Sequence, residues 1–415
     1  MRRKTAVTTA AMITGALALG ACGQGGPTAE SGEITDGKVV LALLNDQSSV
    51  YKDLSGPNSL IAIEMAIEDY KEEYGDDAVA TEIETVQADH KNDPAVANTK
   101  AQELYDREQA DVILDVPTSS AALAVAGQAA AKKKLFLNVG AATTELTGAQ
   151  CNKYTFHWAY DTYMLANGTG RTVTENGAKD WSIIYPDYAF GQDMEKSFTA
   201  AIESSDGSVG QSIATPFPND NFTTFLTKAA SSKPDVIGTM QAGGDLINLV
   251  KQYNESGLAD QGISLAVGLM FITDIHSLGV EQFQGINFTD AWYWNLDDET
   301  RAWADRFQEE TGTRPSFAHA GNYSAAWQYL EAVQRAGTDD ADAVVAELEG
   351  SKVEDVFLRN GEIRAEDHRV IHDAYLAKVK SPDEVTEEWD YEEIVSTIPA
   401  EEAFRPVSES DCSMG

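Results

Sequence analysis

Short apolar runs alternate with amphipathic segments along most of the chain, and this alternation restricts the fold more than any other feature. In the first third of the sequence the apolar runs have the length and branching of buried strands. They cover residues 39–44, 83–88, 112–116 and 135–139. The segments between them have helical spacing, as at Ile63, Ile67 and Tyr70. Buried strands that alternate with amphipathic helices indicate a parallel sheet covered on both faces.

The same alternation restarts after a break at residues 141–160, which predicts a second α/β unit. Its expected strands are 181–185, 207–213, 236–240 and 263–267. After a second break come three expected helices and one strand, at 301–310, 319–336, 341–348 and 371–379. The segment from residue 381 to Cys412 is acidic and is expected to form a loop.

The sequence therefore predicts an α/β fold of two Rossmann-like lobes with parallel sheets, joined by a three-stranded hinge. The chain is expected to cross between the lobes near residues 157, 290 and 365. Lobe I then comprises residues 38–157 and 291–364, and lobe II comprises 158–290 and 365–400. Residues 401–415 are the C-terminal tail.

The N-terminus has the two parts of a secretory signal. Arg2, Arg3 and Lys4 precede an apolar stretch at 6–19, which is shorter than the about 20 residues of a membrane-spanning helix. The stretch ends in the residues LGAC, and this quartet resembles the bacterial lipobox. The resemblance implies cleavage after residue 21, lipidation of Cys22 and an exported protein anchored to the outer face of the cell membrane. An ordinary signal peptide with an incidental cysteine is the alternative. Residues 22–37 are expected to be a flexible tether.

The chain is strongly acidic, with 67 Asp and Glu against 30 Lys and Arg. Removal of residues 1–21 takes away three basic residues, so the mature charge is 27 − 67 = −40. Such a surface repels nucleic acid and anionic lipid headgroups, and we exclude both as partners.

Five segments in order resemble the branched-chain amino-acid binding family of ABC importers, which has the type I periplasmic-binding fold. The first two are LNDQSSVYKDLSGPNSLIAIEMAIEDY and ADHKNDPAVANTKAQELYDREQADVILDVPTSSAALAVAGQAA; the others are NVGAATTELTG, YPDYAFGQDM and QAGGDLINLVKQ. The resemblance covers about residues 38–400. It implies a monomer that binds a small molecule and delivers it to permease and ATPase subunits, without a cofactor.

Two loops of small residues form the expected ligand site. They follow the strands at 112–116 and 135–139, at the edge of a parallel sheet where ligands bind. N–H groups at helix starts attract anions, so the site suits a carboxylate. The family resemblance places ligand contacts at Ser119, Ala141 and Thr143, with Ser120 as a weaker candidate. Helix capping is the alternative role of these Ser and Thr residues.

Aromatic residues are the second part of the expected site. By resemblance, Tyr51 lines the pocket after the first strand, and Phe190 occupies a position often held by Tyr. Trp158 and residues 292–294 lie near the expected crossings and are weaker candidates, with packing as the alternative.

One departure from the family concerns the ligand's amino group. Amino-acid binders of this family have an acidic residue after the strand that corresponds to 263–267, whereas this chain has Met270 and Phe271 there. Asp274 or Asp245 is expected to supply the charge instead, unless the ligand lacks an ammonium group or Asp274 only begins a helix. The expected ligand is a small amino acid or related carboxylate. Aromatic or other organic acids, short amides and urea are the alternatives.

Cys151 and Cys412 are expected to form a disulfide, because two thiols of an exported chain usually pair. Two buried free thiols are the alternative. The six histidines form no ligand cluster in the sequence, so no metal site is expected. Val370 and Ile371, between His368 and His372, indicate a strand.

The sequence also bears on two other classes of function, enzymes and sensors. The G-x-S-x-G, P-loop, H-E-x-x-H and G-x-G-x-x-G motifs of enzymes are missing, and the paired Asp297 and Asp298 suit a helix cap, so no enzyme is expected. A ligand-sensing ectodomain remains as an alternative, which would require a separate signalling partner.

Overall fold

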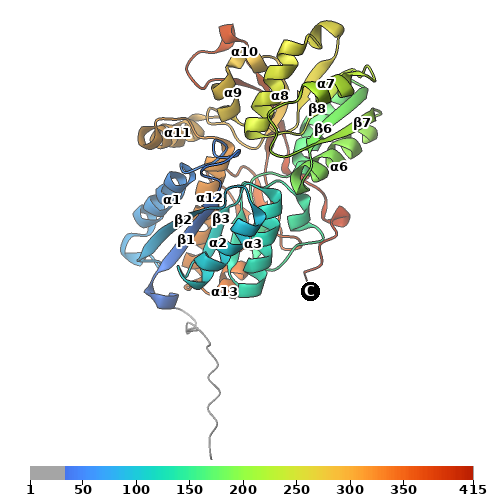
Figure 1. Cartoon of the computed structure of the whole chain (residues 1–415). Helices are drawn as coiled ribbons and strands as arrows, with labels where there is room; N and C mark the ends of the chain where they lie inside the picture. Colours follow the sequence, from blue (N-terminus) through green and yellow to red (C-terminus); the bar gives the residue numbers. More distant parts are fainter. Residues whose placement is uncertain (1–32, 415) are drawn as a thin grey trace, which may run out of the picture.

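The computed structural model describes residues 33–414, so the predicted signal peptide and Cys22 lie outside the described residues. Two parallel sheets form the centres of two lobes, one below the other in Figure 1. The predicted α/β fold with two lobes is therefore confirmed.

Lobe I is built on a five-stranded parallel sheet in the order β2-β1-β3-β4-β5. Its strands are β1 Val39–Asn45, β2 Ile83–Asp89, β3 Val112–Asp115, β4 Leu135–Asn138 and β5 Thr155–His157. All residues of β1, β3, β4 and β5 are buried, as expected for strands covered on both faces. The helices that follow β1, β2 and β3 are α1 Ser59–Tyr74, α2 Pro94–Asp106 and α3 Ser119–Lys132. The Asp-Pro start of α2 is typical, because the Asp93 side chain accepts bonds from the N–H groups of Ala95 and Val96.

Lobe II is built on a four-stranded parallel sheet in the order β7-β6-β8-β9. Its strands are β6 Asp180–Pro186, β7 Ser208–Thr215, β8 Val236–Thr239 and β9 Ser264–Val267. Its helices are α6 Ala189–Ser204, α7 Thr223–Ala230, α8 Gly243–Ser256, α9 Ile272–Leu278 and α10 Val280–Phe283. The short α4 Thr162–Leu165 and α5 Arg171–Glu175 lead into this lobe and are joined by one π-helical turn, Ala166–Gly170.

The remaining elements include two small antiparallel sheets and three helices, in the part of the chain that runs from lobe II back to lobe I. β10 Asn287–Asp290, β14 Ala374–Val379 and β15 Glu392–Ile398 form an antiparallel sheet in the order β10-β14-β15. The helices α11 Asp298–Thr311, α12 Phe317–Ala336 and α13 Ala341–Leu348 return to lobe I, where α12 packs against α1. A second small sheet contains β11 Lys352–Val353, β12 Gly361–Ile363 and β13 Val370–Ile371. The strand expected between His368 and His372 is confirmed by β13.

One expectation about the C-terminal segment was wrong. Residues from 381 to Cys412 were expected to be a loop, but β15 pairs with β14 and α14 Ala400–Ala403 follows it. β15 is an edge strand with several exposed residues, so it lacks the apolar run that marks a buried strand. The short β5 and β10 were missed for a related reason: each contains only three or four residues.

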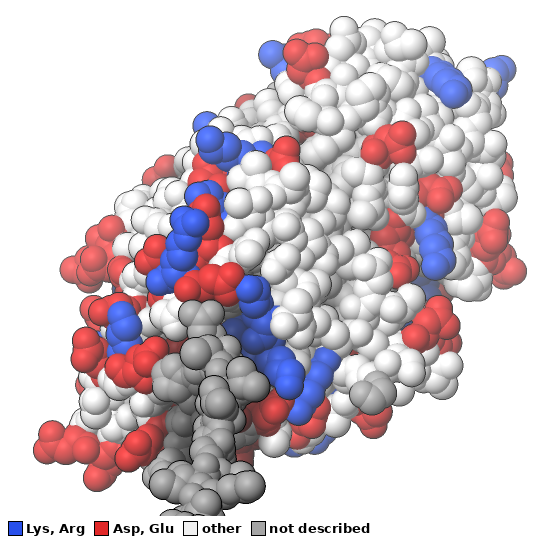
Figure 2. All heavy atoms as spheres, turned by 60° about the horizontal axis from the view of Figure 1, so that its bottom comes forward, with Lys and Arg blue, Asp and Glu red and all other residues white. Residues whose placement is uncertain are grey.

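Acidic and basic side chains lie close together on the face shown in Figure 2. The ion pairs of lobe I include Lys132 with Asp106 and Lys134 with Asp111. Within residues 33–414, the helices are each too short or too polar to cross a membrane.

Candidate ligand-binding site

The two sheets present their carboxyl-terminal edges to each other. Three contacts join the segments that follow these edges. The Tyr51 and Tyr188 hydroxyls are 2.5 Å apart, Gly244 N–H at the start of α8 donates to Val50 O at 3.3 Å, and Thr144 N–H donates to Asp193 Oδ2 of α6 at 2.7 Å. Tyr51, Val50 and Thr144 belong to lobe I, whereas Tyr188, Gly244 and Asp193 belong to lobe II. The interface between the lobes is thus the place where ligands bind in open α/β sheets.

The loop after β3 places two unpaired hydroxyl groups at the start of α3. Ser119 is the first residue of α3 and Thr118 is its N-cap. Both side chains are buried, and neither Ser119 Oγ nor Thr118 Oγ1 has a hydrogen-bond partner in the part of the chain that the structure describes. Ser120, the weaker candidate, is half-buried one residue later. Buried hydroxyl groups normally have a partner, so these two are available to a ligand.

The loop after β4 holds Ala141 and Thr143, both fully buried. Thr143 Oγ1 accepts a bond from Glu145 N–H, so this residue does cap the following 3₁₀ turn. Its hydroxyl hydrogen is still available to a ligand. The Ala141 N–H is directed instead to Asn138 Oδ1 at 3.3 Å, and the Ala141 carbonyl oxygen lies 2.7 Å from His157 Nε2.

Aromatic rings from both lobes surround the junction of Tyr51 and Tyr188. The Phe217 ring stacks on Tyr188 with centroids 4.4 Å apart and lies 5.6 Å from Tyr51, and Phe190 lies 5.9 Å from Tyr188. Burial raises the pKa of Tyr51 and of Tyr188 well above the usual value for tyrosine, so both hydroxyls stay protonated. Tyr51 and Phe190, predicted from the sequence, therefore reach one aromatic cluster from opposite lobes.

A second aromatic group lies where lobe I meets the loop after β9. The Phe271 ring stacks on Phe317 at 4.4 Å, and Tyr160 meets Phe317 edge-on at 4.9 Å. Tyr160 also donates its hydroxyl to Gly140 O, at the start of the second small-residue loop. Met270 is fully buried in an apolar cluster of lobe II with Leu246. The position where the family resemblance implies an acidic residue is thus apolar.

The two acidic candidates have different surroundings. Asp274 Oδ2 accepts the Phe271 N–H at 2.9 Å, so this carboxyl group caps the first turn of α9. Asp245 accepts the Asn219 N–H and lines a hollow of 400 Å³ that also borders Val50 of lobe I. Burial raises the pKa of each carboxyl to about 7. Asp274 is thus bonded as a helix cap, whereas Asp245 lines an open hollow beside Val50 of lobe I.

The tryptophans near the crossings are packing residues. The indole N–H of Trp158 donates to Ser324 Oγ in α12, that of Trp292 to Val356 O and that of Trp294 to Trp389 O. All three side chains are buried. Their polar atoms are already paired away from the aromatic cluster.

Sequence reasoning missed Tyr188, Phe217 and Tyr160. A usable signal was present for two of them, because Tyr188 and Phe217 each come two residues after the end of β6 and of β7, which match predicted strands. Tyr160 follows β5, which the sequence did not reveal. Aromatic residues just beyond the carboxyl ends of parallel strands lie at the sheet edge that binds ligands.

The disulfide expected from the sequence is present in the structure, where Cys151 bonds to Cys412. It joins the end of the tail to the segment that follows the Thr143 loop. Arg405 of the tail donates to the carbonyl oxygens of Thr144 and Thr147 of the same segment.

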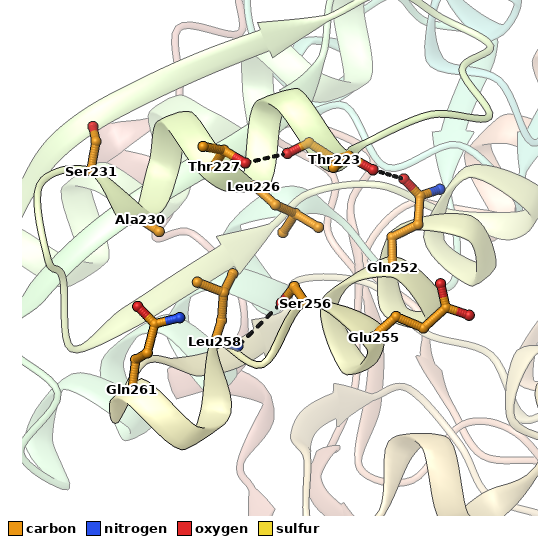
Figure 3. A pocket seen from close by; sticks show the side chains of 10 residues that line it. All are labelled: Thr223, Leu226, Thr227, Ala230, Ser231, Gln252, Glu255, Ser256, Leu258 and Gln261. Carbon is orange, nitrogen blue, oxygen red and sulfur yellow. Dashed lines mark hydrogen bonds between the residues drawn. The ribbon is translucent and has the colours of Figure 1, made fainter.

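A hollow of 640 Å³ on lobe II differs from the interface between the lobes (Figure 3). Its lining comes from α7, α8 and the segment that follows α8. Its polar groups bond to one another, as Thr227 Oγ1 does to Thr223 O and Thr223 Oγ1 to Gln252 Oε1. A molecule held there would touch only lobe II, so it could not bring the lobes together.

Comparisons with known proteins agree with this geometry. The sequence model of a family described as periplasmic binding protein matches residues 38–384. A periplasmic binding protein from Burkholderia mallei is 40% identical with a TM-score of 0.87, over 91% of this chain and 99% of that chain. A branched chain amino acid ABC transporter periplasmic ligand-binding protein from Burkholderia xenovorans is 35% identical with a TM-score of 0.81, over 91% and 100% of the chains.

A more distant structure shares the fold alone. It is a solute binding protein of an ABC transporter from Rhodopseudomonas palustris in complex with 3,4-dihydroxy benzoic acid. It is 23% identical with a TM-score of 0.77, over 88% of this chain and 98% of that chain. Among curated proteins, none matches the chain. Because the family model spans most of the sequence and both lobes are shared with relatives of 35–40% identity, the chain belongs to the periplasmic binding protein family, a class of non-enzymatic solute-binding proteins.

Proposed function

We propose that this protein is the lipid-anchored binding component of an ABC importer and that it holds a small amino acid or a related carboxylate between its lobes. The observation that carries the proposal is the pair of unpaired hydroxyls, Ser119 Oγ and Thr118 Oγ1, at the start of α3. A desolvated carboxylate needs several donors, and hydroxyls beside a helix N-terminus supply them. The name of the 35% identical relative supports an amino acid.

The aromatic lining favours a second candidate, an aromatic acid. Tyr51, Tyr188, Phe190 and Phe217 surround the point where the lobes meet, and Met270 and Phe271 replace the acidic partner of an ammonium group. An ammonium buried there without a carboxylate would be costly. Asp245 is the group that would supply this charge for an amino acid.

Residues 38–157 with 291–364 and residues 158–290 with 365–400 would act as the two bodies that close on the ligand. Closure is favoured only by contacts that improve in the closed state. The bonds between Thr144 and Asp193 and between Tyr51 and Tyr188 would be of this kind, because each joins residues of the two proposed bodies. A monomer in this closed form would present the ligand to the permease and ATPase subunits.

A thermal-shift screen tests the ligand class. The panel contains L-leucine, L-valine, L-phenylalanine, benzoate, 4-hydroxybenzoate and benzamide, and we expect a carboxylate to raise the melting temperature. A ligand at 100 times its Kd stabilises a protein by about 2.7 kcal/mol. Ser119→Ala should weaken carboxylate binding by about 1–3 kcal/mol, the cost of leaving a buried acceptor unpaired. Titration calorimetry measures this loss.

Thr227→Ala is the control, because Thr227 is also a hydroxyl residue of a helix but is exposed in α7 and lines the hollow of lobe II. It should leave the affinity unchanged. Binding of benzamide but of none of the carboxylates would refute the anion site. Tight binding of leucine or valine would select the amino-acid candidate, and binding of benzoates alone would select the aromatic acid.

The lipid anchor has a separate test. Cys22→Ala should release the protein into the medium or leave it unprocessed, because a bilayer holds the mature chain only through acyl groups on that cysteine. Fractionation of cells that express each variant measures the distribution. A correctly cleaved Cys22→Ala protein that stays with the membrane would contradict the anchor.

A further inference from the structure

Asp115 is a buried carboxyl group between the two loops of the proposed site. It is the last residue of β3, four residues before Ser119, and its side chain is fully buried. Its backbone oxygen accepts the N–H groups of Val139 and Gly140, which begin the second loop. A Cβ added to Gly140 would lie 2.5 Å from Asp115 Oδ1, so the carboxyl group lies directly against that loop. One residue thus contacts both loops.

The backbone at this point is strained. Asp115 has φ of 80° and Val116 has φ of 60°. A β-branched residue in this left-handed region is a genuine outlier. Strain of this kind collects at functional sites, where the surrounding structure holds it in place.

The groups that face Asp115 are neutral. The Asn45 side chain of β1 donates to Asp115 Oδ2 at 3.1 Å, and the neutral polar side chains of Ser55, Asn322 of α12 and Ser59 of α1 lie nearby. Within the described residues, Asp115 Oδ1 has no hydrogen-bond partner. The titratable groups nearby are Tyr160, His319 beside Ser55, and His157 beside Ala141. Burial raises the pKa of Tyr160 and lowers the pKa of His319 to about 4 and of His157 to about 3, so all three are uncharged near neutral pH.

Burial also raises the pKa of the Asp115 carboxyl to about 6, although the nearby polar groups of Ser55, Asn45, Asn322 and Ser59 oppose that rise. The group is therefore ionised above about pH 6 in the protein without ligand. A carboxylate bound at Ser119 and Thr143 would then bring a second negative charge close to it. Two carboxylates in one buried site cannot both stay ionised without cost, so one of them takes up a proton.

We propose that Asp115 couples ligand binding to the uptake of one proton, so that the protein binds carboxylates more tightly as the pH falls. The inference rests on the proposed carboxylate site. In the coupled step, solvent supplies a proton to the Asp115 carboxylate, the ligand keeps its negative charge, and the loops close around both groups. Asp115 is a positioning residue in this scheme, because it acts on the ligand through the two loops and its charge.

The sign of the pH dependence follows from linkage. The complex has a higher Asp115 pKa than the free protein, so between these two values the complex binds more protons. Affinity is then lost as the pH rises through about 6, by at most about tenfold per pH unit. Below the pKa that Asp115 has in the protein without ligand, its carboxyl group is already protonated, so the affinity no longer changes with pH.

Titration calorimetry tests the coupling on the full mature chain. The probes are L-leucine, L-phenylalanine and benzoate, measured from about pH 5.5 to about pH 8 in two buffer series whose ionisation enthalpies differ, MES followed by phosphate and Bis-Tris followed by Tris. We expect up to one proton taken up per ligand bound above about pH 6, and a Kd that rises with pH. Asp115→Asn should abolish both effects and approach the wild-type affinity at the acid end.

Asp111→Asn is the matched control. Asp111 is a buried aspartate directly before the same strand, at the end opposite to Asp115, and it has Lys134 as a counter-charge. This variant should keep the slope and the proton uptake. The proton count on the wild-type protein tests the proposal even if Asp115→Asn does not fold.

The possible failures can be distinguished. Binding of a probe without proton uptake, or with uptake that Asp115→Asn preserves, would overturn the role of Asp115 and leave the proposed function intact. If Asp245→Asn removed the dependence of affinity on pH and Asp115→Asn did not, the proton would belong to Asp245 of lobe II. This result would also overturn the inference. If none of the carboxylates binds, both the proposed function and the coupling of ligand binding to proton uptake are refuted.

Discussion

Asp161→Ala should lower the free energy of unfolding by about 3–5 kcal/mol, the cost of leaving a buried charge without its partner. The partner is Arg369, whose Nε donates to Asp161 Oδ2 at 2.8 Å and whose side chain is 1% exposed. Arg369 also donates to Trp158 O. One guanidinium group therefore connects the segment that contains Trp158 and Asp161 to the segment before β14. Equilibrium denaturation in urea, followed by circular dichroism, measures the loss.

Asp161 also caps α4, because its Oδ1 accepts the Met164 N–H. Asp161→Asn retains a cap acceptor but removes the charge, so its loss should be smaller than that of Asp161→Ala. Burial is the largest single influence and would raise the pKa of the Asp161 carboxyl, but Arg369 together with the Met164 N–H bond and Arg405 holds that pKa below its usual value. The ion pair therefore stabilises the fold above about pH 4 and loses this effect as the pH falls through the lowered pKa.

An exposed ion pair provides the comparison. Arg301 and Glu387 lie 2.9 Å apart with both side chains exposed, so Glu387→Ala should have a much smaller effect. Equal losses for Asp161→Ala and Glu387→Ala would show that the crossing does not depend on the buried pair. Arg369→Met in the Asp161→Ala background should recover part of the loss, because it removes the unpaired charge.

The parallel sheets could be predicted from the sequence because their strands are covered on both faces. The apolar run predicted at 39–44 is β1, and the run at 236–240 is β8, each with every residue buried. The edge strand β15 could not be found in this way, since its exposed residues carry no apolar run. The short β5 and β10 are fixed by their neighbours in the sheets rather than by their own three or four residues.

The candidate site could be predicted only within each lobe. Ser119 and Thr143 lie in loops that follow predicted strands, so the rule for sheet edges selects these two loops, and the family resemblance then proposes the individual residues. The contact between Tyr51 and Tyr188 depends on how two distant segments meet, and no local pattern contains that information. Asp115 was missed because it lies inside an apolar run, where its unusual φ and its neutral surroundings become visible only in the folded chain.

Loss of the disulfide between Cys151 and Cys412 should have an effect of the same order as Asp161→Ala. The bond closes a loop of 261 residues, and in the chain-entropy model such a bond contributes up to about 5 kcal/mol. We expect reduction, or Cys412→Ser, to lower the melting temperature in differential scanning calorimetry. Cys151→Ser combined with Cys412→Ser should match the single variant, since either change removes the same bond.

The tail should also affect the ligand site, because it holds the segment that directly follows Thr143. Ser410 Oγ donates to Thr147 O at 2.7 Å, and Arg405 donates to Thr144 O, next to the bond between Thr144 and Asp193 that joins the lobes. Reduction of the disulfide, which frees residues 405–412 from this segment, should therefore increase the ligand dissociation rate more than it lowers the association rate. Stopped-flow measurement of both rates checks this, with Arg405→Ala as a variant that retains the disulfide. An unchanged melting temperature after complete reduction would show that the bond does not stabilise the fold, and an unchanged dissociation rate would separate the tail from the site.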